Sequence, residues 1–286
     1  MNNDTVKLGV VPTRRFIFSK EDALKFKTLT YDRLNELGIE YVDIEDINEE
    51  GLFYSENDME AVASKLHRQK ADALFFPHCN FGTEDIVGKL AQKMNLPVLL
   101  WGPRDEAPLA DGSRLRDTQC GLFATGKVLR RFTVPFTYMP NDTLSSESFA
   151  RGIMNFLAAA NVVRVFKRTR ILQISTRPAD FWTMMCNEGE LLERFGIQIS
   201  PVPLSEVVAK AKTLMDAPTA EVTDTVEYVK QNMDVCVTEE GVLKVAALKT
   251  AMKHFAQELK CNAIAIQCWS ALQAEFGMMP CAGNAL

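Results

Sequence analysis

Short apolar runs alternate with amphipathic segments over the first hundred residues. The apolar runs have the length and composition of buried strands and lie at 6–11, 41–44, 73–76 and 98–101. The segments between them carry apolar residues at helical spacing and lie at 20–37, 56–69 and 83–94. Strands joined by helices in this order predict repeated βα units in a doubly wound parallel sheet, which is an α/β fold.

The same pattern restarts after a basic break at 167–170. Before the break we expect a polar loop at 102–118, a helix at 119–132, a short strand at 136–139 and a long helix at 145–165. After it we expect strands at 171–174, 197–202 and 263–266, and helices beginning near Asp180, Ser205, Thr219 and Glu239. The sequence therefore predicts two consecutive Rossmann-like parallel-sheet domains, 1–167 and 168–286, the second incomplete at its C-terminal end.

Composition excludes several classes of protein. A net charge of −5 argues against nucleic acid as the main partner, since phosphate binding requires a basic face. The first residues lack the basic and apolar regions of a signal peptide, and no apolar run reaches the roughly 18–20 residues that cross a membrane. The 7 cysteines form no CxxC pair, which favours reduced thiols. We expect a cytoplasmic protein with no membrane contact.

Polar and aromatic residues follow the predicted strands at the edge where ligands of parallel sheets bind. These residues lie at 13–16, 78–84, 102–106, 175–178 and 267–269. Hydrogen-bonding and aromatic groups of this kind suit a polyhydroxylated small molecule. No GxGxxG, GxxxxGK[ST] or GxSxG motif follows a predicted strand, so phosphate-loop and serine-hydrolase interpretations fail.

Three of these residues have two interpretations each. Arg14 and Arg15 either contact a ligand or are solvated surface cations. Trp269 directly follows an apolar strand, where it either stacks on a ligand or wedges between domains.

Structural roles are favoured for several other residues. His78 is expected to bond its own turn and not a metal, because no second histidine lies nearby. Cys79 and Cys268 are expected to be small buried residues, since no base flanks either thiol. The pair Met184–Met185 is expected to fill the core.

Four segments, taken in their order along the chain, resemble the L-fucose isomerase-like family. They read NFGTEDIVGKLAQKMNLPVLLWG, CGLFATGKVLRRF, RPADFWTMMCNEGELLERFGIQISPVPLSEV and CNAIAIQCWSALQAEFGMMPC. The resemblance implies two Rossmann-like N-terminal domains followed by a third domain, which we expect to be absent from this chain. It also implies conversion of an aldose to a ketose through a cis-enediol with a divalent ion, typically Mn²⁺.

The resemblance places the metal-binding carboxylates beyond the last matched segment. We therefore assign no catalytic or metal-binding residue, and we expect no metal to bind tightly to this chain. The resemblance and the strand-end loops together predict these substrate-binding residues: Arg14, Arg15, Cys79, Asn80, Phe81, Arg177, Gln267 and Trp269. Some relatives place a tryptophan where this chain has Cys79. In the family one subunit helps close its neighbour's site, which predicts a homo-oligomer.

Two functions remain open at this point. The first is a sugar isomerase of the family, acting on a free sugar and represented here by a chain that we expect to be inactive alone. The alternative is a non-enzymatic cytoplasmic sugar-binding or regulatory module, in which two doubly wound domains bind a ligand by hinge closure.

Overall fold

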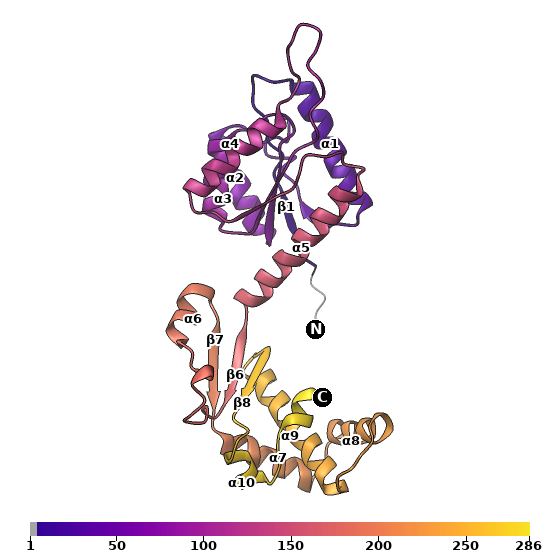
Figure 1. Ribbon diagram of the computed structural model, residues 1–286, viewed down its shortest axis with the longest axis vertical. Coiled ribbons are helices and arrows are strands. Elements are labelled where there is room, and N and C mark those ends of the chain that lie inside the picture. The colour runs from indigo at the N-terminus through magenta and orange to yellow at the C-terminus, as the bar shows by residue number, and fades with distance from the viewer. Residues whose placement is uncertain (1–4) are drawn as a thin grey trace. The chain divides into compact units, whose positions relative to one another are not determined.

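The computed structural model describes residues 5–286 and divides the chain into two compact units, Met1–Arg164 and Val165–Leu286 (Figure 1). The domain boundary expected from the sequence, at 167/168, falls a few residues beyond this division. Each unit has its own parallel sheet and its own apolar core. The two units are described separately below.

The first unit is built on a five-stranded sheet with the order β2-β1-β3-β4-β5, in which every neighbouring pair is parallel. The strands are β1 (Leu8–Val10), β2 (Tyr41–Val42), β3 (Ala73–Pro77), β4 (Val98–Trp101) and β5 (Phe136–Tyr138). The central strands β3 and β4 are buried throughout, as strands covered on both faces must be. The predicted α/β class and strand sequence are confirmed.

Helices cover both faces of this sheet (Figure 1). The helices are α1 (Lys20–Glu36), α2 (Met59–Arg68), α3 (Glu84–Met94), α4 (Thr118–Arg131) and α5 (Glu147–Lys167), with a short 3₁₀ turn, η1 (Glu56–Asp58), before α2. Residues of α2, α3 and α4 share one core with Leu74, Phe76 and Leu100. Residues of α1 and α5 pack on the other face against Phe75 and Trp101. Alternate residues of β3 therefore serve opposite layers.

Helix α5 is long and apolar enough to cross a membrane by length and composition alone. Its Phe149, Ile153 and Phe156 lie in the core of the first unit, and Phe149 packs edge-on against Trp101 with ring centroids 4.8 Å apart. A core helix meets the same length and composition criteria, so this helix does not indicate a membrane protein.

The second unit is built on a three-stranded parallel sheet with the order β7-β6-β8. Its strands are β6 (Arg170–Ile174), β7 (Gln198–Val202) and β8 (Ala263–Ile266). Its helices are α6 (Glu188–Phe195), α7 (Leu204–Asp216), α8 (Ala220–Asn232), α9 (Glu239–Glu258), α10 (Ala271–Phe276) and α11 (Cys281–Ala285), and η2 (Trp182–Met184) is a 3₁₀ turn. Residues of α7 and α9 form the core against Leu172 and Ile174.

Two expectations for the segment before β7 are wrong. The helix expected from Asp180 begins at Glu188, because Asn187 accepts a hydrogen bond from the Glu190 N–H at 3.1 Å and so caps the helix there. Met184 and Met185 are each 62% exposed and do not fill the core. The expected starts of α7, α8 and α9 agree with the structure to within a residue.

Candidate functional site

The order of strands in each sheet marks where a ligand site is expected. In the first unit the chain moves outward from β1 to β2 on one side and to β3 on the other, so the order reverses between β1 and β3. In the second unit the order reverses in the same way between β6 and β8. Ligands of open α/β sheets bind beyond the carboxyl ends of the two strands at such a reversal. All eight predicted substrate-binding residues follow these four strands.

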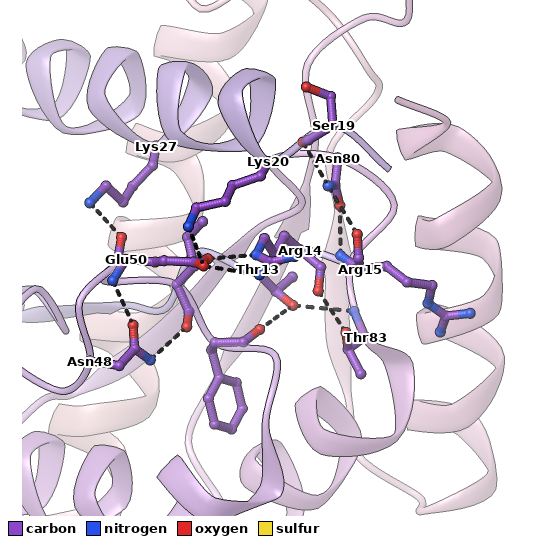
Figure 2. A network of polar contacts seen from close by, with 12 residues as sticks. Thr13, Arg14, Arg15, Ser19, Lys20, Lys27, Asn48, Glu50, Asn80 and Thr83 are labelled. Atoms are coloured by element: carbon purple, nitrogen blue, oxygen red, sulfur yellow. Dashed lines mark hydrogen bonds and ion pairs between the residues drawn. The ribbon is translucent and has the colours of Figure 1, made fainter. Parts of the chain in front are cut away.

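The Arg14 guanidinium is held by Glu50 and not by solvent (Figure 2). Its Nε donates to Glu50 Oε2 at 2.6 Å, and its Nη2 donates to Oε1 at 3.1 Å. The guanidinium also lies 4.1 Å from the centre of the Tyr54 ring. Arg14 is therefore buried, so the surface-cation interpretation is wrong for this residue.

Glu50 is shared between two cations. Lys20 Nζ lies 2.9 Å from Glu50 Oε1, and Lys27 Nζ donates to the Glu50 backbone carbonyl at 2.8 Å. Burial alone would raise the pKa of the Glu50 carboxyl. The hydrogen bonds from Arg14 and Lys20 outweigh burial and hold that pKa below its usual value. Glu50 therefore stays ionised and fixes the start of the loop after β1.

Asn80 joins the loop after β1 to the loop after β3 (Figure 2). Its Oδ1 accepts from the backbone N–H groups of Arg15 at 2.8 Å and Gly82 at 3.3 Å. Its Nδ2 donates to the carbonyls of Arg15 at 3.3 Å and Ser19 at 3.2 Å. Asn80 has no exposed surface, and all of its amide bonds hold backbone. Its assignment as a substrate-binding residue stays a prediction.

Arg15 and Phe81 lie together beside this amide. Arg15 Nε donates to the Gly82 carbonyl at 3.0 Å, and its guanidinium lies 4.6 Å from the centre of the Phe81 ring. Phe18 stacks on the same ring with centroids 5.3 Å apart. Phe16 and Ile17, which lie between Arg15 and Phe18 in the sequence, are 85% and 73% exposed. The loop thus presents an apolar tip at the carboxyl edge of the sheet.

His78 is a buried structural residue, as the sequence predicts. Its Nδ1 lies 2.8 Å from the Phe81 carbonyl, which can only accept, so Nδ1 carries the proton. Burial lowers the pKa of His78 to about 4, so the ring is neutral. Its Nε2 is buried without a hydrogen-bond partner among residues 5–286.

Cys79 lies between these residues and is fully buried. Its thiol donates to the Pro77 carbonyl at 3.7 Å, and burial raises the pKa of the thiol far above its ordinary value. A protonated, buried thiol has no nucleophilic role, so the expectation of a small buried residue is confirmed. Its place among the substrate-binding residues is untested.

The loop after β4 is fastened to the same edge from two sides. Asp105 Oδ1 accepts from the backbone N–H of Thr118 at 2.9 Å, which holds the loop to the start of α4. Arg116 pairs with Asp22 of α1 at 2.8 Å, and its guanidinium lies 4.0 Å from the centre of the Phe26 ring. Sequence reasoning missed Glu50, Asp22 and Arg116, because no local motif marks partners so distant along the chain.

In the second unit the loops after β6 and β8 meet through their side chains. Ser175 Oγ donates to Gln267 Oε1 at 2.7 Å. Trp269 is 55% exposed and packs edge-on against Phe181, with ring centroids 5.1 Å apart. Arg177 Nη1 donates to the carbonyls of Pro178 at 3.1 Å and Ala179 at 2.9 Å, which are in its own loop. Gln267 and Trp269 therefore lie at the reversal point, with Ser175 as a partner that the sequence did not single out.

The part of the chain that the structure describes contains no cluster of three or more His, Cys, Asp or Glu side chains arranged to hold a metal ion. The carboxylates at the candidate sites are instead occupied by cations or by backbone N–H groups. These residues do not fit the divalent ion that the family resemblance implies.

These features define an α/β protein with candidate ligand sites at the reversal points of parallel sheets. The chain belongs to the fucose/sulfoquinovose isomerase family, because the sequence profile described as "Fucose/sulfoquinovose isomerase, N-terminal domain" matches residues 9–167, more than half of its length. The family resemblance read from the sequence is confirmed. The family is one of sugar isomerases that interconvert aldoses and ketoses.

Individual relatives extend the match beyond that profile. A protein named sulfoquinovose isomerase from Priestia aryabhattai is 26% identical over 240 residues, which cover 81% of this chain and 51% of the relative. One from Alkalicoccus urumqiensis is 23% identical, covering 80% of this chain and 51% of the relative. The chain thus spans about half the length of the curated relatives it matches. A periplasmic solute-binding protein from Actinobacillus succinogenes aligns with 13% identity and a TM-score of 0.25, too low to support an argument.

Proposed function

We propose that this chain supplies sugar recognition to an aldose–ketose isomerase of the family. The observation that carries the proposal is the position of the predicted recognition residues in the folded units. The family profile matches the unit that holds Arg15 and Phe81, and the predicted recognition residues follow the strands that flank a reversal point. These loops lie where ligands of open α/β sheets bind, which supports a recognition role for them.

The groups at these loops suit a sugar. Arg15, Arg177 and Gln267 offer N–H donors for hydroxyl and carbonyl oxygens, and Trp269 offers an exposed aromatic surface for the C–H face of a sugar ring. Arg14, Asn80 and Cys79 support the proposal differently, because they are buried and hold the loops in place. In the proposal, sugar contact in the first unit falls to Arg15 and Phe81.

The isomerisation step itself is proposed for the intact enzyme. A cis-enediol pathway needs a base that moves a proton between adjacent carbons and a charge that stabilises the enediolate. No set of residues among 5–286 fits the divalent ion, Mn²⁺ by resemblance, so the proposal gives this chain binding and positioning alone. We place the enzyme in the cytoplasm, with a small sugar as substrate and neither nucleic acid nor membrane as partner.

We also propose that the intact enzyme is a homo-oligomer. Two adjacent exposed apolar side chains, Phe16 and Ile17, support this proposal, because contiguous apolar surface marks protein–protein contacts. Light scattering of the intact enzyme tests it. Replacing both residues by serine is expected to shift the enzyme toward smaller species, and an unchanged molar mass would contradict the assignment of this tip.

The central experiment measures isomerase activity in a chain extended past Leu286 to the length of the curated relatives. With Mn²⁺ we expect turnover of L-fucose, D-arabinose or sulfoquinovose, and Trp269→Ala is expected to raise KM. The proposal would be contradicted if the folded, metal-loaded protein were inactive on all three sugars and on other common aldoses. Leu109→Ala, a substitution of an exposed apolar residue in the loop after β4, is the matched control.

A non-enzymatic sugar-binding module is the second candidate. The missing metal cluster among residues 5–286 favours it, because binding needs no metal centre. Calorimetric titration of the 286-residue chain with the same sugars, without metal, separates the two candidates. Binding together with inactivity of the extended chain would favour the module, whereas turnover would exclude it.

A further inference from the structure

Ser175 has a left-handed backbone conformation that its neighbours in the chain do not explain. Its φ is 65°, a value that residues other than glycine seldom adopt. Most other non-glycine residues with positive φ stand at the carboxyl ends of helices, where this conformation is common, and these are Lys70, Asn95, Thr133 and Lys260. Ser175 instead follows strand β6, so a helix end does not account for it. Strained residues of this kind cluster at binding sites.

Hydrogen bonds on both sides hold the Ser175 backbone in place. Its N–H donates to the Val202 carbonyl at the end of β7 at 2.9 Å. Its carbonyl accepts from Gln173 Nε2 at 3.1 Å. With the backbone fixed, the Oγ reaches across to β8 and donates to Gln267 Oε1 at 2.7 Å. The unusual backbone thus serves to direct one hydroxyl at one amide.

In the structure this bond leaves the nitrogen end of the Gln267 amide free. A serine hydroxyl can donate one hydrogen bond and accept others, and here it donates to Oε1. The amide oxygen is therefore held by Ser175, while the two N–H groups of Nε2 have no hydrogen-bond acceptor within the described residues 5–286. A free donor pair calls for acceptor oxygens on the ligand. Arg177 and the Trp269 indole are also donors, and both lie in the same two loops.

We propose that Ser175 is a positioning residue that holds the Gln267 side chain through its amide oxygen, so that the N–H groups of the amide are free to meet a ligand. The ligand group read by Gln267 is then a hydrogen-bond acceptor, such as a hydroxyl or carbonyl oxygen of a sugar. The identity of that ligand rests on the proposed function, whereas the orientation of the amide does not.

Three substitutions separate the hydroxyl from the backbone conformation, because glycine, asparagine and aspartate all tolerate positive φ. Ser175→Gly removes the partner of Gln267. Ser175→Asn supplies an N–H donor in its place and is the rescue variant. Ser175→Asp supplies only acceptors, which turn the Gln267 amide around so that an N–H points at the carboxylate. Circular dichroism and thermal melting of each variant establish that the fold is kept.

The first readout is the side-chain amide signal of Gln267 in the ¹⁵N–¹H spectrum of the whole chain without ligand, assigned by its loss in Gln267→Glu. We expect wild type and Ser175→Asn to resemble each other. Ser175→Asp is expected to move one amide proton downfield and to slow its exchange, because that proton becomes bonded to a charged acceptor. Identical Gln267 signals in the wild type, Ser175→Gly and Ser175→Asp would overturn the proposal.

The second readout is calorimetric titration with L-fucose and with sulfoquinovose. We expect Ser175→Asp to weaken sugar binding about tenfold, the equivalent of one hydrogen bond to a correctly turned amide, and Ser175→Asn to keep it within about twofold. Equal weakening in Ser175→Asn and Ser175→Asp would overturn the assignment of the free N–H groups to the ligand. A wild-type chain that binds no sugar refutes the ligand assignment for this chain, while the amide spectrum still decides the positioning role and the activity of the extended chain still decides the proposed function.

Discussion

The side-chain amide of Asn80 bonds both backbone groups of Arg15, accepting from its N–H at 2.8 Å and donating to its carbonyl at 3.3 Å. The Asn80 side chain thereby bonds the backbone of the loop after β1 through one acceptor and one donor, as a neighbouring strand would. It joins residues that are far apart in sequence and adjacent at the reversal point of the sheet. The arrangement ties the position of Arg15, a proposed recognition residue, to the stability of the first unit.

Asn80→Ala is expected to lower the free energy of unfolding of the first unit by about 2–4 kcal/mol, because it leaves several buried backbone groups without partners. Denaturant unfolding measures the loss. Asn57→Ala, which changes an exposed side chain of η1 in the same unit, is the matched control and is expected to have little effect. A loss below about 1 kcal/mol for Asn80→Ala would show that water satisfies these groups equally well.

Gly121→Ala is expected to destabilise the first unit strongly. A Cβ at this position of α4 would lie 1.7 Å from the Phe81 carbonyl oxygen, so the loop after β3 or the helix must move. We expect a loss of about 3 kcal/mol or more in urea unfolding. Gly126→Ala on the same helix is the control, because its Cβ would meet only the far edge of the Phe136 ring at 3.3 Å. Equal effects of the two substitutions would contradict the close approach of α4 to this loop.

The buried, neutral His78 makes stability depend on pH between about 6.5 and about 4. Its folded pKa is lowered, so below pH 6.5 the unfolded chain binds a proton that the native chain does not. Stability must therefore fall as the pH falls, by about 2 kcal/mol from pH 6.5 to pH 5. Unfolding titrations at several pH values measure this, and His78→Gln should flatten the slope. Replacing the exposed His67 by glutamine should leave the dependence of stability on pH unchanged.

Glu50 makes the stability of the first unit depend on pH in a more acidic range. Its folded pKa lies below the ordinary value of 4.5, so its stabilisation is complete above that pH and is lost as the pH falls through the folded pKa. Glu50→Gln is expected to cost about 2–3 kcal/mol at pH 7, and the gap to the wild type should narrow below pH 4.5. Glu60→Gln, at an exposed pair with Lys93, should change stability little at either pH. If the difference in free energy of unfolding between Glu50→Gln and the wild type were the same at every pH, the proposed sharing of this carboxylate by two cations would be refuted.

Periodicity was sufficient to predict the βα order, because strand and helix repeats are local properties of the sequence. The sequence also predicts a structural role for His78, from the lack of a second histidine nearby, and the partner of His78 lies in its own turn. It could not predict that Glu50 would bury Arg14, because ion pairs between distant segments depend on the tertiary fold. Nor could it predict that the Asn80 amide would bond backbone groups. An asparagine after a strand looks the same in the sequence whether its amide binds a ligand or a neighbouring loop.

The exposed methionines at 184 and 185 illustrate a different limit. Apolar composition predicts burial, yet burial requires a facing surface, and α6 has no buried residue in this unit. The sequence also places the start of α6 too early. A cap at Asn187 decides that boundary, and a single side-chain bond outweighs a weak preference for helix over the preceding residues.

The carboxylate of Glu50 serves two cations of unequal exposure, the buried Arg14 and the half-exposed Lys20. Two positive charges and one negative charge leave one charge uncompensated, even though the chain as a whole is acidic. Ionic strength acts on the members of this triad in order of their contact with solvent. Added salt should loosen Lys20 while Arg14 remains bound, so the mobility of the start of α1 becomes a function of the salt concentration.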